Sequence, residues 1–398
     1  MTFFWALLWG AVVAGLLIRA VRQFRAYTVV APDDVVRQAA APDLRVVVPA
    51  RNEAGNIGGC VEGLVSQRYP GRWETVVVDD NSTDQTVAVA RRTAGERPGF
   101  SIVAAGELPA GWTGKPHACW RGASGFRGEW LAFVDADTVA SPELFATAVA
   151  YAETHGIDML SLEPEQEMVG FWERVILPAG MFMMAFFATD LRAINDPDCT
   201  DAAANGQFIL VRRQVYETVG GHAAVAAAIS EDTALARRIK AAGYRTMLAG
   251  SRDLIRVRMY TRFAEIWEGL SKNAVNVVGS RRAAVRTALQ GLGLGWGALL
   301  IPLWGALAAG ATLPVLLLTV GSLALFATHI SGARYFRLPP WYGLLFPLGY
   351  TLVAAIVANS LRSYRVGAVR WKGRTYAPCA EEAGSLPRPA VAAGDTRD

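Results

Sequence analysis

Three acidic clusters stand in order along the first 240 residues: Asp79-Asp80, Asp135-Ala136-Asp137 and Glu231-Asp232. The first two follow directly on short apolar runs, residues 73–78 and 130–134, which have the length of buried strands. Carboxylates at the carboxyl ends of buried parallel strands lie where open α/β sheets bind ligands. Two such ends, together with a third carboxylate pair before a predicted helix over residues 233–242, indicate a site for a charged, metal-bound substrate.

Residues 44–250 alternate short apolar runs with longer amphipathic stretches, which predicts an α/β fold with a mostly parallel sheet and helices on both faces. The predicted strands cover residues 44–48, 73–78, 101–105, 130–134, 158–162 and 208–211. We expect Pro49 to stop the first strand. Ser82 is expected to cap the following helix, with Gln85 in the capping-box position, and Ser141 to cap the helix that Pro142 opens. The predicted catalytic domain spans residues 40–286.

Apolar segments flank this domain, since hydrophobic residues make up 52% of the chain and its mean hydropathy is positive. Residues 3–18 are apolar and are followed by Arg19, Arg22 and Arg25. In a cleaved signal peptide the basic residues would precede the apolar run, so residues 1–25 are better explained as a membrane anchor. Because Lys and Arg stay on the inner side of membranes, the anchor is expected to end in the cytoplasm.

Residues 287–361 are expected to hold further membrane helices. Residues 291–332 carry no charge apart from His329 and are long enough for two crossings, and residues 341–360 form a third apolar segment. Three crossings would place the basic residues after 361 outside, although the positive-inside rule places them inside. One of the three segments could therefore be re-entrant or interfacial, and the sequence leaves open which. Residues 362–398 are expected to form a basic and then disordered cytoplasmic tail.

The apolar stretch 168–188 is expected to lie on the membrane surface as an interfacial helix. Glu173 and Arg174 lie within it, and a single crossing there would separate Glu231-Asp232 from the other acidic clusters. A buried core helix is the alternative interpretation.

Charge and cysteine content narrow the possible partners. The net charge of +4 concentrates beside apolar segments, which favours anionic lipid over nucleic acid, and no basic-aromatic nucleic-acid motif is present. The four cysteines are scattered without paired spacing, so the sequence indicates neither a zinc site nor a disulfide framework. We expect a reducing, cytoplasmic catalytic region.

The acidic clusters suit chemistry on a sugar nucleotide. Its diphosphate needs a divalent cation to neutralise charge on the leaving group, and Mg²⁺ typically takes one or two carboxylates plus substrate phosphate. Asp135 and Asp137 are two residues apart, so on an extended segment their side chains would point the same way. Asp80 is placed to accept a hydrogen bond from the base or ribose. A carboxylate of Glu231-Asp232 could deprotonate an acceptor hydroxyl as general base.

These residues also carry a family resemblance. The segments Val46–Glu53, Val78–Asp84, Asp135–Asp137 and Glu231-Asp232 resemble, in order, the signature of family 2 inverting glycosyltransferases with the GT-A fold, over residues 44 to about 260. The resemblance implies a nucleotide-sugar donor, usually a uridine diphosphate sugar, with Mg²⁺ or Mn²⁺. It implies that Asp80 binds uridine, that Asp135 and Asp137 bind metal and donor, and that Asp232 is the catalytic base with Glu231 supporting it.

Further segments resemble a membrane-anchored subgroup associated with hopanoid biosynthesis, near the ceramide and carotenoid glycosyltransferases: residues 108–115, 205–208, 220–222 and 371–374. This resemblance implies a lipid acceptor and a multi-pass protein of the bacterial inner membrane whose catalytic domain faces the cytoplasm. Processive synthases of the wider family carry a Gln-x-x-Arg-Trp motif, which the comparable stretch 260–267 lacks. Its absence favours transfer of one sugar over polymer formation.

The remaining candidate residues surround these motifs. We expect donor contacts from Ala50, Arg51, Glu53 and Lys115, and acceptor contacts from Gln207 and His222. Two other functions compete. A nucleotidyltransferase would carry a glycine-rich loop after the first strand, where this chain has Pro49–Glu53. An inactive lipid-binding scaffold would have no reason to keep clustered carboxylates that repel one another.

Overall fold

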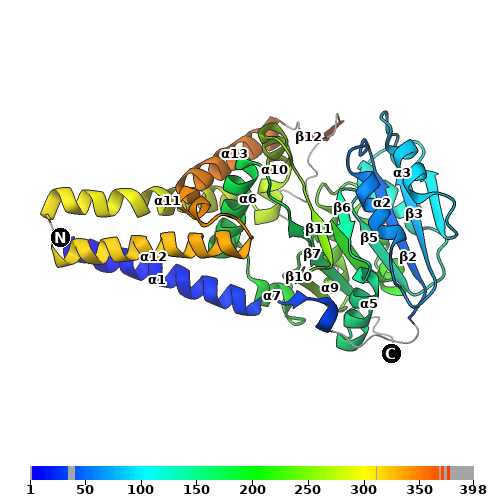
Figure 1. Cartoon of the computed structure of the whole chain (residues 1–398), viewed down its shortest axis with the longest axis horizontal. Coiled ribbons are helices and arrows are strands. Elements are labelled where there is room, and N and C mark those ends of the chain that lie inside the picture. Colours follow the sequence, from blue (N-terminus) through cyan, green and yellow to red (C-terminus); the bar gives the residue numbers. More distant parts are fainter. Residues whose placement is uncertain (1, 35–40, 311, 367–368, 372–373, 377–398) are drawn as a thin grey trace, which may run out of the picture.

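The computed structural model describes residues 2–34, 41–310, 312–366, 369–371 and 374–376. Figure 1 shows a sheet domain at one end of the molecule and long helices that project from it. Most of the predicted tail over residues 362–398 lies outside the described residues.

An eight-stranded sheet forms the centre of the catalytic domain. In spatial order its strands are β1 (Val29–Val30), β10 (Thr246–Ser251), β7 (Met159–Glu163), β9 (Phe208–Arg212), β5 (Trp130–Val134), β2 (Leu44–Ala50), β3 (Trp73–Asp79) and β4 (Phe100–Ala104). Only β9 runs antiparallel to its neighbours in this sheet. The predicted mostly parallel sheet is therefore confirmed.

Helices cover both faces of the sheet, as the alternating sequence pattern predicted. On one face the apolar core includes side chains of α2 (Ile57–Val65), α3 (Thr86–Ala94) and α5 (Leu144–His155). On the other face it includes side chains of α4 (Gly114–Ala123), α8 (Arg213–Thr218) and α9 (Glu231–Ala241). Short elements complete the domain: η1 (Pro32–Asp34), α7 (Leu191–Asn195) and η3 (Gly221–Val225).

The six predicted strands are present with ends shifted by two residues or fewer, but three local predictions were wrong. Pro49 does not stop β2, which continues to Ala50, because pairing with β5 already ends at Val47 and no ladder bond on that side is lost. Ser82 does not cap α3; its hydroxyl accepts a hydrogen bond from the Asn52 backbone N–H instead. Ser141 does not cap α5, which begins after Glu143.

A small second sheet lies beside the carboxyl ends of the main strands and consists of β6 (Thr138–Ala140), β11 (Ile255–Val257) and β8 (Glu165–Gln166). The step from β5 to β6 places Asp135 and Asp137 in a tight turn, closed by a hydrogen bond from the Thr138 N–H to the Asp135 carbonyl (3.2 Å). The prediction of an extended segment was therefore wrong. The turn still brings both residues to the sheet edge where ligands bind.

Five segments are long and apolar enough to cross a membrane: α1 (Thr2–Ala26), α6 (Phe171–Met183) continuing into η2 (Met184–Ala188), α11 (Arg281–Ala309), α12 (Leu313–Tyr335), and η4 (Pro340–Leu345) continuing into α13 (Phe346–Val366). The amphipathic helix α10 (Phe263–Val278) connects the sheet domain to α11. A short pair, β12 (Val369–Trp371) and β13 (Arg374–Tyr376), follows α13.

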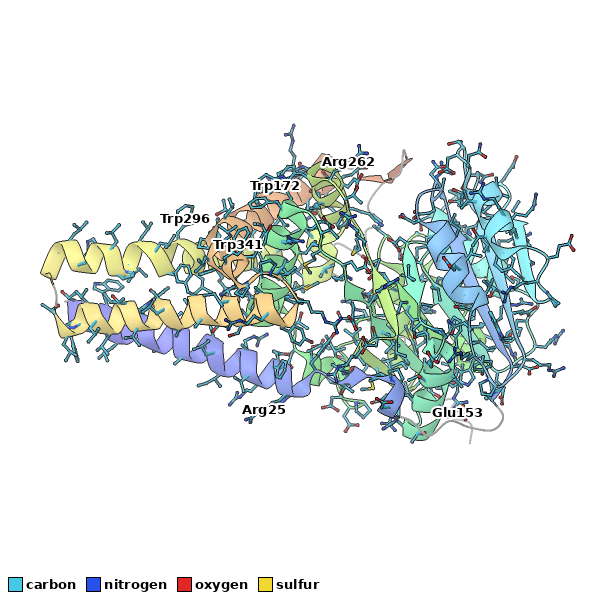
Figure 2. The ribbon with its side chains drawn as sticks, viewed as in Figure 1. Arg25, Glu153, Trp172, Arg262, Trp296 and Trp341 are labelled. Atoms are coloured by element: carbon cyan, nitrogen blue, oxygen red, sulfur yellow. The ribbon has the colours of Figure 1, made fainter. Side chains whose placement is uncertain are left out.

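Helices α1, α11 and α12 project together from the sheet domain (Figure 1). The indole N–H of Trp9 on α1 donates to the hydroxyl of Ser322 on α12 (3.2 Å), a polar link inside an otherwise apolar bundle. The labelled Arg25, Trp172, Arg262 and Trp341 lie near the junction of these helices with the sheet domain (Figure 2). Arginine and tryptophan are the residues that favour the membrane–water boundary.

The segment α6–η2 lies across the direction of the long helices (Figure 1), and hydrogen bonds hold each of its ends to another element. At its start, the buried Glu173 forms two hydrogen bonds to Arg258 (3.1 and 3.2 Å), the residue after β11. At its end, Arg19 near the domain end of α1 donates to the carbonyls of Ala185 (3.2 Å) and Thr189 (2.6 Å).

The last apolar segment folds back onto α12. A side chain on Gly343 of η4 would collide with the backbone of α12 at Ile330, so η4 packs directly against that helix. Ile330 lies five residues before the end of α12, about 8 Å along the helix axis. From there α13 returns toward the sheet domain, where the Tyr364 hydroxyl donates to the Lys272 carbonyl (3.2 Å).

Candidate active site

A large cavity of about 3790 Å³ opens at the carboxyl ends of the main strands. Its walls include one or more residues of each acidic cluster: Asp80, Asp135, Asp137, Glu231 and Asp232. The structure thus brings together carboxylates that are more than 150 positions apart in the sequence. The sequence-based expectation that they share one site agrees with their position.

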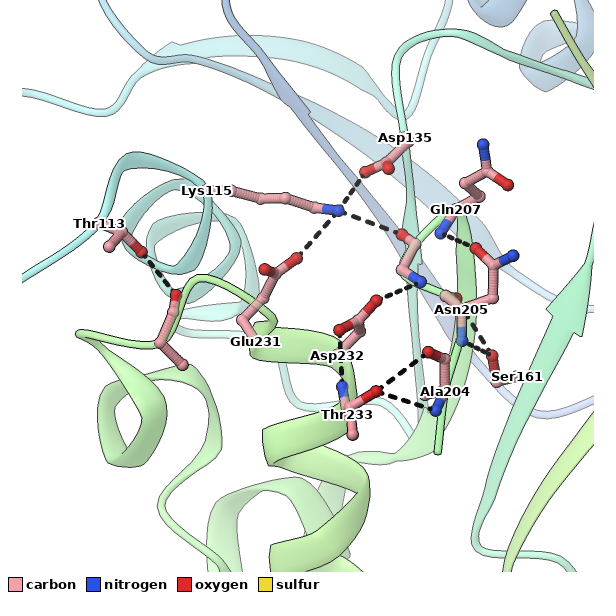
Figure 3. A network of polar contacts seen from close by, with 12 residues as sticks. Thr113, Lys115, Asp135, Ser161, Ala204, Asn205, Gln207, Glu231, Asp232 and Thr233 are labelled. Atoms are coloured by element: carbon pink, nitrogen blue, oxygen red, sulfur yellow. Dashed lines mark hydrogen bonds and ion pairs between the residues drawn. The ribbon is translucent and has the colours of Figure 1, made fainter. Parts of the chain in front are cut away.

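Lys115, in the first turn of α4, joins two of the clusters. Its ammonium group lies 2.7 Å from Asp135 Oδ1 and 2.9 Å from Glu231 Oε1, and it donates to the Gly206 carbonyl at 3.4 Å (Figure 3). Burial would lower the pKa of Lys115, but the neighbouring carboxylates raise it well above its ordinary value. Lys115 is therefore a permanently charged cation in the middle of the site.

Asp232, in the first turn of α9, is held by two backbone N–H groups. Gly206 donates to Oδ2 (2.8 Å) and Thr233 donates to Oδ1 (2.7 Å) (Figure 3). Glycine at position 206 lets both side chains approach the loop, because a Cβ there would come within 2.9 Å of Asp232 Oδ2 and Lys115 Nζ and displace them. The loop is fixed in turn by Asn205, whose backbone exchanges hydrogen bonds with the Ser161 hydroxyl on β7 (2.8 and 3.1 Å).

The two adjacent carboxyls of α9 have opposite electrostatic environments. Burial, and then the charge of Glu231, raise the pKa of Asp232 to about 6. Burial would also raise the pKa of Glu231, but Lys115 and Lys272 lower it. Glu231 is therefore the ionised partner of the lysines, while Asp232 can gain and release a proton near neutral pH, which is the property of a general base.

The loop after β2 holds the Asp80 turn in place. Arg51 Nη1 donates to the carbonyls of Asp80 (2.7 Å) and Asn81 (3.1 Å), and the Asp80 N–H donates to the Ala50 carbonyl (2.8 Å). The Glu53 N–H donates to the Thr86 hydroxyl (2.7 Å). All four predicted donor residues of this region, Ala50, Arg51, Glu53 and Asp80, line the cavity. Arg51 in addition positions Asp80, a role that the sequence did not indicate.

The two predicted acceptor residues have different positions. Gln207 lines the cavity, its carbonyl accepts from the Asp135 N–H (3.2 Å), and its side-chain oxygen accepts from Gln166 (3.4 Å). His222 is buried and hydrogen-bonds the Tyr216 hydroxyl through Nδ1 (2.9 Å). Burial lowers the pKa of His222 to about 4, so it is a neutral core residue that lies away from the lining of the cavity. The position of His222 does not support the predicted acceptor contact.

Sequence reasoning missed Lys272, which lies on α10 and lines the same cavity. Burial lowers the pKa of Lys272, while Glu231, Asp232 and Asp135 act in the opposite direction. The available signal was a single lysine in the otherwise apolar and polar-neutral run of residues 269–278. The supporting roles of Asn205 and Ser161 were also missed, because hydrogen bonds to a loop backbone leave no mark in a sequence pattern.

The carboxylates of this site suit a divalent cation that binds together with the phosphate groups of the enzyme's substrate. The described residues contain no group of three or more His, Cys, Asp or Glu side chains arranged to hold a metal. Asp135 and Asp137 line the cavity, and a cationic nitrogen, Lys115 Nζ, already lies against Asp135. Two carboxylates with substrate phosphate are a usual ligand set for Mg²⁺.

The cavity continues from the acidic site toward the long helices, where its lining becomes apolar. This part includes Val21 and Phe24 of α1, Met181 and Phe182 of α6, and Phe186 of η2. The π-helical turn η2 is an uncommon backbone feature that recurs at functional sites. One continuous space therefore has a charged end over the sheet and an apolar end against the helices.

Comparisons with known proteins show the family and the fold of this chain. Residues 42–273, more than half of the chain, match the family described as Glycosyltransferase like family 2. A 4,4'-diaponeurosporenoate glycosyltransferase of Staphylococcus aureus (strain USA300) is 26% identical over 354 residues, which cover 85% of this chain and 89% of that protein. A mannosyltransferase from Pyrobaculum calidifontis, solved in complex with GDP-Man and Mn2+, has a TM-score of 0.53 at 20% identity and covers 91% of this chain and 98% of its own. The chain therefore belongs to glycosyltransferase family 2 and is a glycosyltransferase with the GT-A fold.

Proposed function

We propose that this protein is a membrane-bound enzyme that transfers one sugar from a nucleotide-diphosphate sugar to an isoprenoid-type lipid, with inversion at the anomeric carbon. The observation that carries the proposal is the single cavity that joins Asp232 and Lys115 to an apolar wall. A charged donor fits the sheet end and a lipid fits the helix end. The name of the diaponeurosporenoate glycosyltransferase supports an isoprenoid-type acceptor, and a hopanoid-type acceptor is one member of that class.

Asp232 is the proposed base. Its raised pKa and its two backbone hydrogen bonds suit a carboxylate that takes a proton from an acceptor hydroxyl and stays in position. The acceptor oxygen then attacks the anomeric carbon on the face opposite the departing nucleoside diphosphate, which inverts the configuration. Glu231 keeps its negative charge beside Lys115 and so holds the proton affinity of Asp232 high.

Lys115 is proposed to bind the donor diphosphate. It already lies between two carboxylates, and a diphosphate in the cavity offers it further anionic oxygens. Asp135 and Asp137 would hold Mg²⁺ or Mn²⁺, as the mannosyltransferase crystallised with GDP-Man and Mn2+ suggests. Bound there, the cation would neutralise charge that develops on the leaving diphosphate. Asp80 would accept a hydrogen bond from the base or ribose.

We further propose that α1, α11 and α12 cross the bacterial inner membrane and that the catalytic domain faces the cytoplasm. Arg22 and Arg25, Arg281 and Arg282, and Arg334 lie at the domain ends of these helices. The segment α6–η2 would lie in the interface. The η4–α13 segment, which starts about 8 Å inside the end of α12, would be re-entrant. This topology keeps the basic residues after α13 on the cytoplasmic side.

The proposal is tested by product identification. Purified protein in lipid nanodiscs is incubated with labelled nucleotide sugars, Mg²⁺ or Mn²⁺, and a bacterial lipid extract, and labelled lipids are analysed by mass spectrometry. We expect one sugar added to one lipid class, and loss of product in Asp137→Ala. Undiminished product in that variant, or a labelled polymer instead of a monoglycosylated lipid, would contradict the proposal.

A further inference from the structure

A second polar group lies in the cavity, away from the acidic clusters. Glu163 is the last residue of β7, and its carboxyl lines the cavity together with Tyr27 and Ser251. The Tyr27 hydroxyl donates to Glu163 Oε2 (2.7 Å), and the Ser251 hydroxyl donates to the Glu163 carbonyl (2.9 Å). In the described part of the chain, Tyr27 is the one side chain that hydrogen-bonds this carboxyl. Glu163 Oε1 is therefore available to a ligand in the cavity.

The fold places this carboxyl on the face of β7 that supports the catalytic loop. Ser161, two residues earlier, holds Asn205 beside Asp232, and residues two apart on a strand point to the same face. Strand β9 lies between β7 and β5, and β5 leads to Asp135. Two strand spacings amount to about 10 Å. The backbones at Glu163 and Asp135 therefore lie about 10 Å apart along the same edge of the sheet.

Glu163 lies at the helix end of the cavity. Tyr27, which hydrogen-bonds it, directly follows α1 and interacts electrostatically with Tyr335, the last residue of α12. Phe24 of α1 meets the Tyr335 ring edge-on with 6.1 Å between ring centroids. A ligand group at Glu163 would therefore belong to a molecule that enters from the helices, which is the route of a lipid acceptor.

The pairing of Tyr27 with Glu163 requires a glycine on the neighbouring strand. Gly250 of β10 pairs with Glu163 in register, and a Cβ at this position would come within 2.5 Å of the Tyr27 hydroxyl. Burial raises the pKa of Glu163, which the hydrogen bond from Tyr27 partly offsets. Glu163 is half-buried and has no ion-pair partner in the described part of the chain, so a hydroxyl in the cavity can supply a further hydrogen bond to its carboxyl.

We propose that Glu163, positioned by Tyr27, is an acceptor-binding residue that accepts a hydrogen bond from a hydroxyl group other than the one that is glycosylated. The preferred acceptor therefore has an extended head group with several hydroxyls on an apolar chain. The proposal rests on the lipid-acceptor function proposed above. A hydroxyl of the transferred sugar has the same chemistry, and the kinetic measurements separate the two sources.

The test compares two competitors with the same eight-carbon chain, octyl β-glucoside with several hydroxyls and 1-octanol with one. The glucoside is added below its micellar concentration and octanol below its solubility limit to the nanodisc transfer assay, and the inhibition constant of each against the lipid acceptor is measured. The variant Glu163→Gln keeps an oxygen for the Tyr27 hydrogen bond but replaces the other oxygen by an N–H donor group. Glu217→Gln, on α8 outside the cavity, is the matched control.

We expect wild type to bind the glucoside more tightly than octanol. The variant Glu163→Gln should raise the inhibition constant of the glucoside about tenfold or more, as loss of a hydrogen bond to a charged group does. The inhibition constant of octanol, the donor KM and the melting temperature of Glu163→Gln should match those of Glu217→Gln. Gly250→Ala should also raise the inhibition constant of the glucoside, because the added methyl group displaces Tyr27.

Equal inhibition constants of the glucoside in Glu163→Gln and wild type would overturn the proposal. A raised donor KM would also overturn it, because the carboxyl would then serve the transferred sugar. If wild type hydrolyses the donor but transfers no sugar to lipid, the proposed lipid-acceptor function itself is wrong. If wild type transfers sugar to lipid and Glu163→Gln does not change the binding of the glucoside, only the role of Glu163 is wrong.

Discussion

Removing the negative charge of Glu231 should shift the acid limb of the pH–rate profile. In wild type the pKa of Asp232 is raised to about 6, first by burial and then by Glu231. A general base acts in its deprotonated form, so kcat should rise with pH through about 6. About one eleventh of Asp232 is deprotonated one pH unit below its pKa and about ten elevenths one unit above it, so kcat should change about tenfold across that window.

The variant Glu231→Gln removes the like charge but leaves the burial of Asp232, its two backbone hydrogen bonds and the attraction of Lys115. The substitution removes the repulsion by Glu231, and this loss lowers the pKa of Asp232. The acid limb should move to lower pH, and the variant should keep a larger fraction of its plateau rate at about pH 5.

The assay measures kcat at saturating donor and acceptor across the pH range at constant ionic strength. Each profile is normalised to its own plateau, because loss of Glu231 also changes the surroundings of Lys115. Glu217→Gln, an exposed carboxyl on α8, should leave the profile unchanged. An acid limb that stays in place or moves to higher pH in Glu231→Gln would refute the assignment of Asp232 as the titrating base.

Three further predictions follow from other contacts. Lys115→Met should raise the donor KM about tenfold or more with the acceptor KM unchanged, because a charged contact to the diphosphate is lost; equal changes in both KM values would contradict this. Arg258→Met should destabilise the protein by about 1–3 kcal/mol, because the buried Glu173 carboxylate loses its ion-pair partner and keeps only the hydrogen bond from the Gly170 N–H; thermal unfolding in detergent measures this, and an unchanged melting temperature would count against the pair. In a background without native cysteines, an impermeant thiol reagent should label the variant Thr312→Cys from outside the cell and the variant Ser280→Cys only after lysis; the reverse pattern would contradict the proposed topology.

The convergence of the acidic clusters could be predicted because parallel strands end at one edge of their sheet. Apolar runs before Asp79 and Asp135 located two of those ends, and β3 and β5 have nearly the predicted bounds. The ion pairs of Lys115 could not be predicted. They join positions 20 and 116 residues apart, through a loop conformation that only the tertiary structure determines.

Local signals failed where tertiary contacts competed with them. Ser82 has the sequence of a helix cap, but its hydroxyl is used by Asn52 of the neighbouring loop. His222 follows two glycines like a loop residue, yet Tyr216 and the core enclose it. The basic residues after 361 indicated that one of the three C-terminal apolar segments could be re-entrant or interfacial. Hydropathy measures the length of an apolar segment and not its direction, so the sequence did not show that α13 is the segment that returns toward the sheet domain.

The most direct test of the account is the turnover number of Asp232→Asn. The amide is nearly isosteric with the carboxylate but cannot take a proton, so kcat should fall by about 100-fold or more, the usual contribution of a general base. The affinity for the nucleotide-sugar donor, measured by calorimetry, should stay close to that of wild type. A kcat within a few-fold of wild type at every pH would show that another group removes the acceptor proton.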